Sequence, residues 1–107
     1  MELPNRRRGF KQKLGWSPKG GGHFTLFATA NYDESGALCE IWVDNMKVGS
    51  DFRAIVKAFA RVVSKAIQNG VPPEEIVKTL LDYEPHEFPH VLGEFIKSAI
   101  PTGVTNE

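Results

Sequence analysis

The residues best suited to chemistry lie near the N-terminus, where basic side chains precede a run of glycines. Arginine and lysine form charge-assisted hydrogen bonds with phosphate, and a glycine-rich turn can direct several backbone N–H groups at an anion. The spacing fits neither a P-loop nor a dinucleotide fingerprint, and the alternative is a solvated arm paired with the acidic remainder of the chain. If the turn and the basic side chains converge, we expect a phosphate or nucleotide site formed by Arg6, Arg7, Arg8, Lys11, Lys13, Gly21 and Gly22.

Other reactive side chains give weaker patterns. His86 and His90 have the spacing of a metal pair, but Pro85 and Pro89 interrupt the helix that this would need, so we expect no metal site. The single cysteine, Cys39, excludes an internal disulfide and is expected to be a small core residue. We therefore expect no catalytic residues in this chain.

A stripe of cations recurs every four residues in the second half of the chain. At this spacing the side chains share one side of a helix, which is most often its solvated side, although it could also follow a polyphosphate or an acidic partner. The stripe consists of Arg53, Lys57, Arg61 and Lys65.

The elements that must position these residues are strands first and helices second. Aromatic and β-branched residues between glycine-containing turns predict strands at 8–16, 23–32 and 38–44. Helical spacing of apolar residues begins at Phe52 and ends near Gly70, and further helices are expected at 72–83 and 90–100. This order indicates an α+β fold, with a small antiparallel sheet of about three strands packed on two to three C-terminal helices.

The strand at 38–44 predicts an interface. Alternation places Cys39, Ile41 and Val43 on one face, and helices can cover only one face of so small a sheet. The second face bears a tryptophan, so we expect it to meet another subunit, unless the N-terminal arm and Trp16 fold over it. The predicted interface consists of Leu38, Glu40, Trp42 and Asp44.

The composition is that of one globular domain. The 107 residues are 41% hydrophobic and 24% charged, with zero net charge. No apolar run approaches the roughly 18 residues of a membrane helix, and no apolar segment follows the N-terminal basic residues as in a secretory signal. One cysteine fits a reducing cytosol, so we expect a cytoplasmic protein. We expect 1–107 to be a single domain, with an extended basic arm at 1–7 and a frayed tail at 102–107.

Several segments together resemble a known domain. They are an opening Arg6–Lys13 of RRxGxTxK type, Gly21-Gly22-His23-Phe24, Glu40-Ile41-Trp42-Val43-Asp44 followed by Lys47, Gly49 and Phe52-Arg53, Gly70-Val71-Pro72-Pro73-Glu74-Glu75, and Tyr83-Glu84-Pro85. Their order resembles the TSCPD-type domain near the C-terminal end of adenosylcobalamin (vitamin B12)-dependent class II ribonucleotide reductases. The resemblance covers residues 4–85, with Lys11 in place of a threonine and Cys39 in place of a glycine.

This resemblance implies a ribonucleoside-diphosphate reductase context, with adenosylcobalamin as cofactor of the full-length enzymes. Their chemistry uses a thiyl radical, a cysteine pair and a large barrel, which one cysteine and 107 residues cannot supply. We therefore expect no cofactor to be bound by this chain alone.

Three functions remain open at this point. The leading hypothesis is a free-standing accessory or regulatory module that assembles with a reductase catalytic subunit or with itself as a homo-oligomer, or that binds a nucleotide. The alternative is a small protein, viral or cellular, that binds nucleotides or nucleic acid through the basic arm. The third is a stand-alone enzyme, which the absence of a nucleophile–base pair disfavours.

Overall fold

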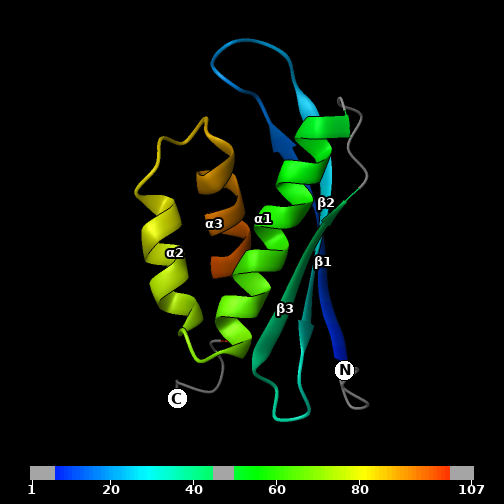
Figure 1. The fold of residues 1–107 in the computed structure, drawn as a ribbon, viewed down its shortest axis with the longest axis vertical. Helices are drawn as coiled ribbons and strands as arrows, with labels where there is room; N and C mark the ends of the chain where they lie inside the picture. Colours follow the sequence, from blue (N-terminus) through cyan, green and yellow to red (C-terminus); the bar gives the residue numbers. More distant parts are fainter. Residues whose placement is uncertain (1–6, 45–49, 102–107) are drawn as a thin grey trace.

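The computed structural model describes residues 7–44 and 50–101, and of Arg7, Arg8 and Ser50 it describes the backbone alone. The described chain has three strands followed by three helices (Figure 1). They are β1 (Arg7–Trp16), β2 (Phe24–Tyr32), β3 (Leu38–Asp44), α1 (Ser50–Gln68), α2 (Pro73–Leu81) and α3 (Phe88–Ala99). This confirms the predicted α+β class. None of these helices is long and apolar enough to cross a membrane.

The strands form an antiparallel meander in which β2 lies between β1 and β3. The turn from β2 to β3 is held by Asp33, whose Oδ1 accepts hydrogen bonds from Ser35 N–H at 2.9 Å and Ala37 N–H at 3.0 Å. The Ser35 hydroxyl donates to the same oxygen at 2.6 Å. Such Asp-centred turns fix the reversal of the chain, and with it the register of the two strands.

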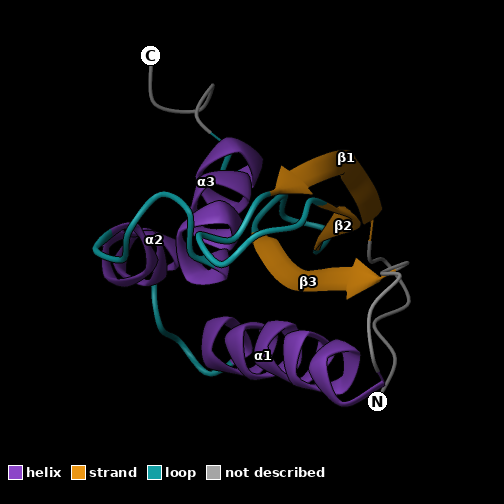
Figure 2. Cartoon of the chain, turned by 90° about the horizontal axis from the view of Figure 1, so that it is seen from above, coloured by secondary structure: helices purple, strands orange, loops and turns teal. Residues whose placement is uncertain are grey.

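Helix α1 lies along β3 and covers the edge of that strand (Figure 2). The Ser64 hydroxyl accepts a hydrogen bond from Ile41 N–H at 2.8 Å and donates to Ile41 O at 3.0 Å. Gln68 Nε2 donates to Cys39 O at 2.9 Å. Since an uncovered strand edge carries unpaired backbone groups, these two side chains satisfy the edge of β3.

Helix α3 packs against β1 and β2 on one side of the sheet, and α2 packs against α3 (Figure 2). Phe10 of β1 stacks on Phe95 of α3 with ring centroids 5.5 Å apart. The helix begins at Phe88, two residues before the predicted start, because Pro89 is accommodated in its first turn, where a missing N–H breaks no helical hydrogen bond.

Trp16 forms the centre of an aromatic cluster beneath the helices. Its ring lies 5.3 Å from Phe24 and Phe52 and 5.5 Å from Phe88, and its Nε1–H donates to His86 O at 2.8 Å. The indole is 8% exposed. The alternative in which Trp16 folds over the opposite face of the sheet is therefore wrong, because this side chain belongs to the core.

A β-bulge corrects one predicted interface residue. Asn31 pairs with Glu40 but Tyr32 pairs with Leu38, so β3 has an extra residue at Cys39. The extra residue breaks the alternation of side chains, and both Leu38 and Cys39 are buried. Leu38 therefore lies in the core and does not share the face of Trp42.

A second bulge, in β1, places Gly9 beneath an aromatic ring. The register shifts between Arg8 and Phe10. A methyl group on Gly9 would overlap the ring of Tyr32, whose hydroxyl donates to Ala99 O at the end of α3. Glycine is thus required here by close packing rather than by its backbone angles.

Candidate functional site

The side of the sheet that faces away from the helices carries chemically distinctive side chains from all three strands. Paired residues on neighbouring strands point to the same face, so the register aligns them in rows. We call this surface the outer face, and it consists of two rows, Lys13–Phe27–Asp44 and Lys11–Thr29–Trp42.

Two aromatic side chains are exposed at the centre of the outer face. Trp42 is 49% exposed and Phe27 is 44% exposed, and they come from neighbouring strands in adjacent rows. Between them and Lys11 lies a hollow of about 280 Å³, which Thr29 and Asp44 also line. A pair of exposed rings on a sheet face is a platform on which a planar ligand can stack.

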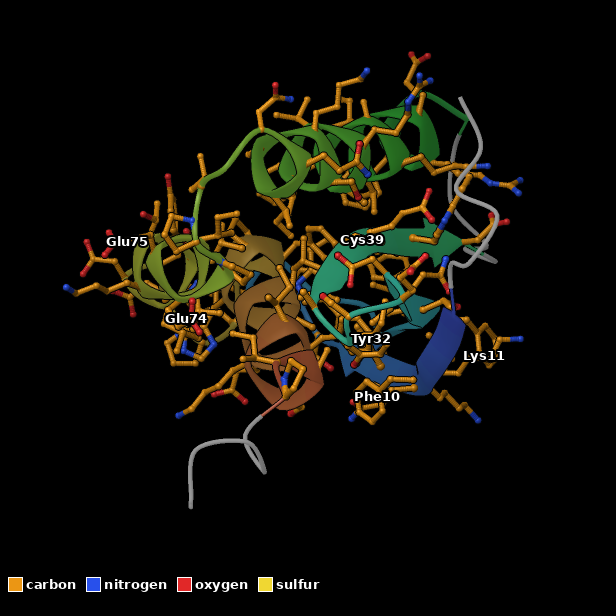
Figure 3. All side chains as sticks on the ribbon, turned by 90° about the horizontal axis from the view of Figure 1, so that it is seen from below. Phe10, Lys11, Tyr32, Cys39, Glu74 and Glu75 are labelled. Carbon is orange, nitrogen blue, oxygen red and sulfur yellow. The ribbon has the colours of Figure 1, made fainter. Side chains whose placement is uncertain are left out.

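Cationic side chains flank this aromatic pair. Lys11 and Lys13 are exposed on β1, and Figure 3 shows Lys11 pointing away from the helices. On the other side, Arg53 Nη2 lies 3.1 Å and Lys57 Nζ 3.6 Å from Asp44 Oδ1. These ion pairs are about half exposed and so contribute little to stability, roughly 0–1 kcal/mol. The aromatic pair thus has two lysines on its β1 side and, on its β3 side, Asp44 with Arg53 and Lys57 paired to it.

One end of this surface contains a buried amide. Asn31 pairs with Glu40 in the register, and its Nδ2 donates to Glu40 Oε1 at 2.9 Å. Asn31 is 5% exposed, and among the described residues its Oδ1 has no hydrogen-bond partner. Glu40, predicted as an interface residue, is thus held in place two residues along β3 from Trp42.

The predicted phosphate site is only partly assembled. Lys11 and Lys13 lie on the outer face, but Gly21 and Gly22 follow the far end of β1, which is ten residues, or roughly 30 Å, long. These glycines, with φ of 114° and 92°, form a separate turn. Arg6 lies outside the described residues, and of Arg7 and Arg8 only the backbone in β1 is described. The extended strand β1 therefore separates the backbone of Arg7 and Arg8 from the two glycines, so these parts of the predicted site do not converge (Figure 1).

The structure instead joins two sites that were predicted separately. The lysines expected to bind phosphate and the tryptophan expected at an interface lie on one face, linked through β2. Sequence reasoning missed Phe27 and the approach of Arg53 and Lys57 to Asp44. The register of β2 with β3 shows that Phe27 lies beside Trp42.

The other residues singled out from the sequence lie outside the two rows of the outer face. No group of three or more His, Cys, Asp and Glu side chains suited to a metal occurs among the described residues. A cleft of about 950 Å³ lies where the β2–β3 turn meets the start of α2, and it is lined mostly by small, apolar and turn residues. Cys39 lies at this cleft but is 7% exposed. Arg61 and Lys65 of the cationic stripe are exposed, as expected for a solvated helix side.

Within residues 7–44 and 50–101, the pKa values of Asp33 and Tyr32 are shifted, and both shifts arise from contacts that hold the fold together. The hydrogen bond from Ser35, followed by that from Ala37, lowers the pKa of Asp33, because these donors stabilise the carboxylate. Burial raises the pKa of the Tyr32 hydroxyl.

Comparison with known proteins identifies the family of this chain. The TSCPD domain family matches residues 4–102, nearly the whole chain. The chain belongs to this family. The match extends beyond Pro85, where the motif resemblance ended, and includes α3. No solved structure shows a significant match to this TSCPD domain.

Two relatives of the TSCPD domain are bacterial vitamin B12-dependent ribonucleotide reductases. The protein from Agrobacterium fabrum is 40% identical over 86 residues, and that from Bradyrhizobium diazoefficiens is 38% identical over 86 residues. Each alignment covers 78% of this chain but 6% of the relative. The chain thus corresponds to a small part of these enzymes.

The motifs shared with the TSCPD family mostly have structural roles. Gly9 lies beneath the Tyr32 ring, and Gly70 ends α1 with φ of 101°. Pro73 starts α2, and Glu74 and Glu75 point outward from its first turn, where acidic groups favour the helix dipole (Figure 3). The family motifs therefore define the scaffold, whereas Trp42 and the lysines of β1 are the chemically distinctive residues that it displays.

Proposed function

We propose that this chain is an accessory module of a B12-dependent ribonucleotide reductase system and that it binds a nucleotide on the outer face of its sheet. Membership of the TSCPD family and relatives named as such reductases support the system. The observation that carries the binding role is the exposed aromatic pair, Trp42 and Phe27, lying between cations.

The chemistry of the outer face suits a base joined to a phosphate. Every nucleobase has a flat face that can stack on an exposed ring, at roughly 1–3 kcal/mol per base. Lysine and arginine side chains bind phosphate oxygens through charge-assisted hydrogen bonds. Thr29, which lines the hollow, adds a hydroxyl that can hydrogen-bond to the edge of a base.

Reduction itself is assigned to another chain. The single cysteine, Cys39, is buried, and one thiol cannot act both as radical carrier and as a dithiol reductant. Adenosylcobalamin is accordingly assigned to the catalytic chain. The module would act by presenting or sensing nucleotides there.

The test is binding of a base–phosphate ligand by the purified 107-residue chain. We expect deoxynucleotides or short oligonucleotides to stabilise it against heat at 50 mM salt, and the shift to shrink at 0.5 M salt. Trp42→Ala should remove the shift. Tyr83→Ala is the matched control, since Tyr83 is also 49% exposed but lies at the end of α2. Equal shifts in both variants, or none in the parent chain, would refute the binding role.

Assembly with a catalytic chain is a second candidate, and a different surface favours it. Ile55 and Val62 of α1 are 64% and 65% exposed and lie two helical turns apart on one side of the helix. Exposed aliphatic side chains on one helix side commonly contact another protein. The double variant Ile55→Lys/Val62→Lys should abolish co-elution with a B12-dependent reductase catalytic chain while nucleotide binding persists. Unchanged co-elution would remove this surface from consideration.

A further inference from the structure

Cationic side chains lie on both sides of the aromatic pair, on the outer face itself and on the neighbouring helix α1. Lys11 and Lys13 are on β1, whereas Arg53 and Lys57 are on α1, beyond β3. Since neighbouring strands are about 4.8 Å apart, β1 and β3 are separated by about 10 Å, and α1 lies further out. Across the surface the order is therefore the β1 lysines, the aromatic rings, the Asp44 carboxylate, and then Arg53 and Lys57, whose two positive charges exceed that of Asp44 by one.

This order distinguishes two kinds of nucleotide ligand. A free nucleotide has its phosphates on one side of the sugar, so it can occupy one cation pair while its base covers the rings. In a nucleic acid strand each nucleotide lies between a 5′ and a 3′ phosphate. A strand therefore places phosphates on both sides of a stacked base, where the cations of β1 and α1 can contact them, whereas a nucleoside 5′-triphosphate does not.

We infer that the outer face binds single-stranded nucleic acid, which crosses the sheet from β1 to α1 with bases stacked on Trp42 and Phe27. The inference rests on the proposed nucleotide-binding function and specifies its ligand. A duplex is excluded by the same geometry, because its base faces are buried in the stack and cannot reach the rings. The surface offers few groups that read a base edge, so binding is tolerant of sequence.

The charge pattern favours this ligand over a second copy of the chain. Among the described residues that line the hollow, Asp44 alone has a carboxylate, and it already faces Arg53 and Lys57. The Glu40 carboxylate, two residues along β3 from Trp42, accepts a hydrogen bond from Asn31. A second copy would place one cation-rich surface against another. A polyanion, by contrast, neutralises both cation pairs and releases counterions from its own phosphates.

The decisive measurement compares ligands of different length on the intact chain. Fluorescence anisotropy of 5′-labelled oligo(dT) and oligo(U) of two to eight nucleotides would be recorded at 50 mM salt, with unlabelled dTTP and UTP as competitors. We expect affinity to rise at least tenfold from the free nucleotide to the length that reaches both cation pairs, and then to level off. A hairpin duplex without single-stranded ends should bind at least tenfold more weakly.

Salt dependence counts the phosphate contacts. If all four cations bind phosphates, the slope of log K against log salt should approach roughly −2.8, since each single-strand contact contributes about −0.7. Lys11→Gln/Lys13→Gln should reduce this slope by about 1.4. Lys78→Gln/Lys97→Gln, on α2 and α3, removes the same charge from the helical side and should leave the slope unchanged.

The aromatic pair has its own test. Trp42→Ala should weaken oligonucleotide binding about 5- to 150-fold, the range that stacking of one base provides. Trp42→Phe should restore most of it, and Tyr83→Ala should have no effect. Circular dichroism would establish that each variant is folded.

Three results would overturn the inference. If dTTP binds as tightly as every oligonucleotide, the site takes a free nucleotide, and the proposed function stands without the strand. If the duplex binds as tightly as the single strand, stacking is absent. If no nucleotide ligand binds but Trp42→Ala disrupts a complex with the catalytic chain, the outer face is a protein interface.

Discussion

Gly9 shows how a single residue controls the packing between β1 and β2. A Cβ atom at this position would overlap the ring of Tyr32, which is itself fixed by the hydrogen bond to Ala99 O. We expect Gly9→Ala to lower the free energy of unfolding by about 1–3 kcal/mol, the usual cost of overpacking. Urea unfolding would measure it. Gly20→Ala is the control, because a methyl group there meets no atom within 4 Å and should change stability by less than about 0.5 kcal/mol.

Asp33 gives the β2–β3 turn a pH dependence. Because its pKa is lowered on folding, the stabilisation by this carboxylate is fully present above its ordinary pKa of 3.8 and is lost as the pH falls through the lower folded value. We expect Asp33→Asn to be less stable than the parent chain at pH 7. The difference between the two should shrink as the pH falls below 3.8, measured by urea unfolding from pH 7 to pH 2.5. A constant difference would show that the charge of Asp33 is not involved.

Individual site residues could be predicted where the residue type and its position in a single strand were enough to indicate exposure. The exposure of Trp42 and of the β1 lysines follows from alternation in single strands. Leu38 was misplaced because the bulge at Cys39 inverts its direction, and a bulge of this kind leaves no mark in residue type. Phe27 was not among the predicted site residues, because only the register of β2 with β3 brings it beside Trp42.

At the scale of elements, the Ser64 hydroxyl forms part of the contact between α1 and the edge of β3. Ser64→Ala would leave Ile41 N–H without its acceptor and would remove the hydroxyl that lies within hydrogen-bond distance of both Ile41 O and Ala60 O. We expect a loss of about 1–3 kcal/mol in unfolding free energy, the cost of buried unsatisfied groups. Ser98→Ala, which removes an exposed hydroxyl bonded within its own helix, should cost less than about 0.5 kcal/mol in the same assay. Equal effects would show that the edge is not satisfied by this contact.

The elements themselves could be predicted because each has a local signal. Aromatic and β-branched residues marked the strands, and Gly70 and Pro73 marked the boundary between α1 and α2. No local signal in the sequence predicted that α1 lies beside β3. That contact arises from Ser64 and Gln68, which look like ordinary helix polar residues until their partners are known.

At the scale of the whole molecule, α3, near the end of the described chain, packs against β1 at its beginning. Phe95 is 1% exposed and stacks on Phe10 of the first strand. We expect Phe95→Ala to cost about 3–5 kcal/mol, a large part of the roughly 5–15 kcal/mol that stabilises a domain. Thermal and urea unfolding should show this loss, with Tyr83→Ala nearly unchanged. A small effect at Phe95 would mean that the sheet and α1 form a stable unit without α3.

The assembly of the outer face could not be predicted from sequence, because it is a property of the whole sheet. Lys13 and Asp44 are 31 residues apart and share a row only through β2. A shift of one residue in the β1–β2 pairing would have moved the lysines to the helical side, and the same shift in the β2–β3 pairing would have moved Trp42 and Asp44 there. The separate predictions of a phosphate site and of an interface therefore merged only when the register was known.

The two tryptophans occupy opposite environments, and each therefore reports a different event by its emission. Trp16 is enclosed by phenylalanine rings, so its emission should shift to longer wavelength only when the core opens to water. Trp42 is already half in solvent, so its emission should respond to a stacked ligand while the chain stays folded. In Trp16→Phe only the emission of Trp42 remains, which reports binding of a ligand. In Trp42→Phe only the emission of Trp16 remains, which reports unfolding, so neither measurement needs an added dye.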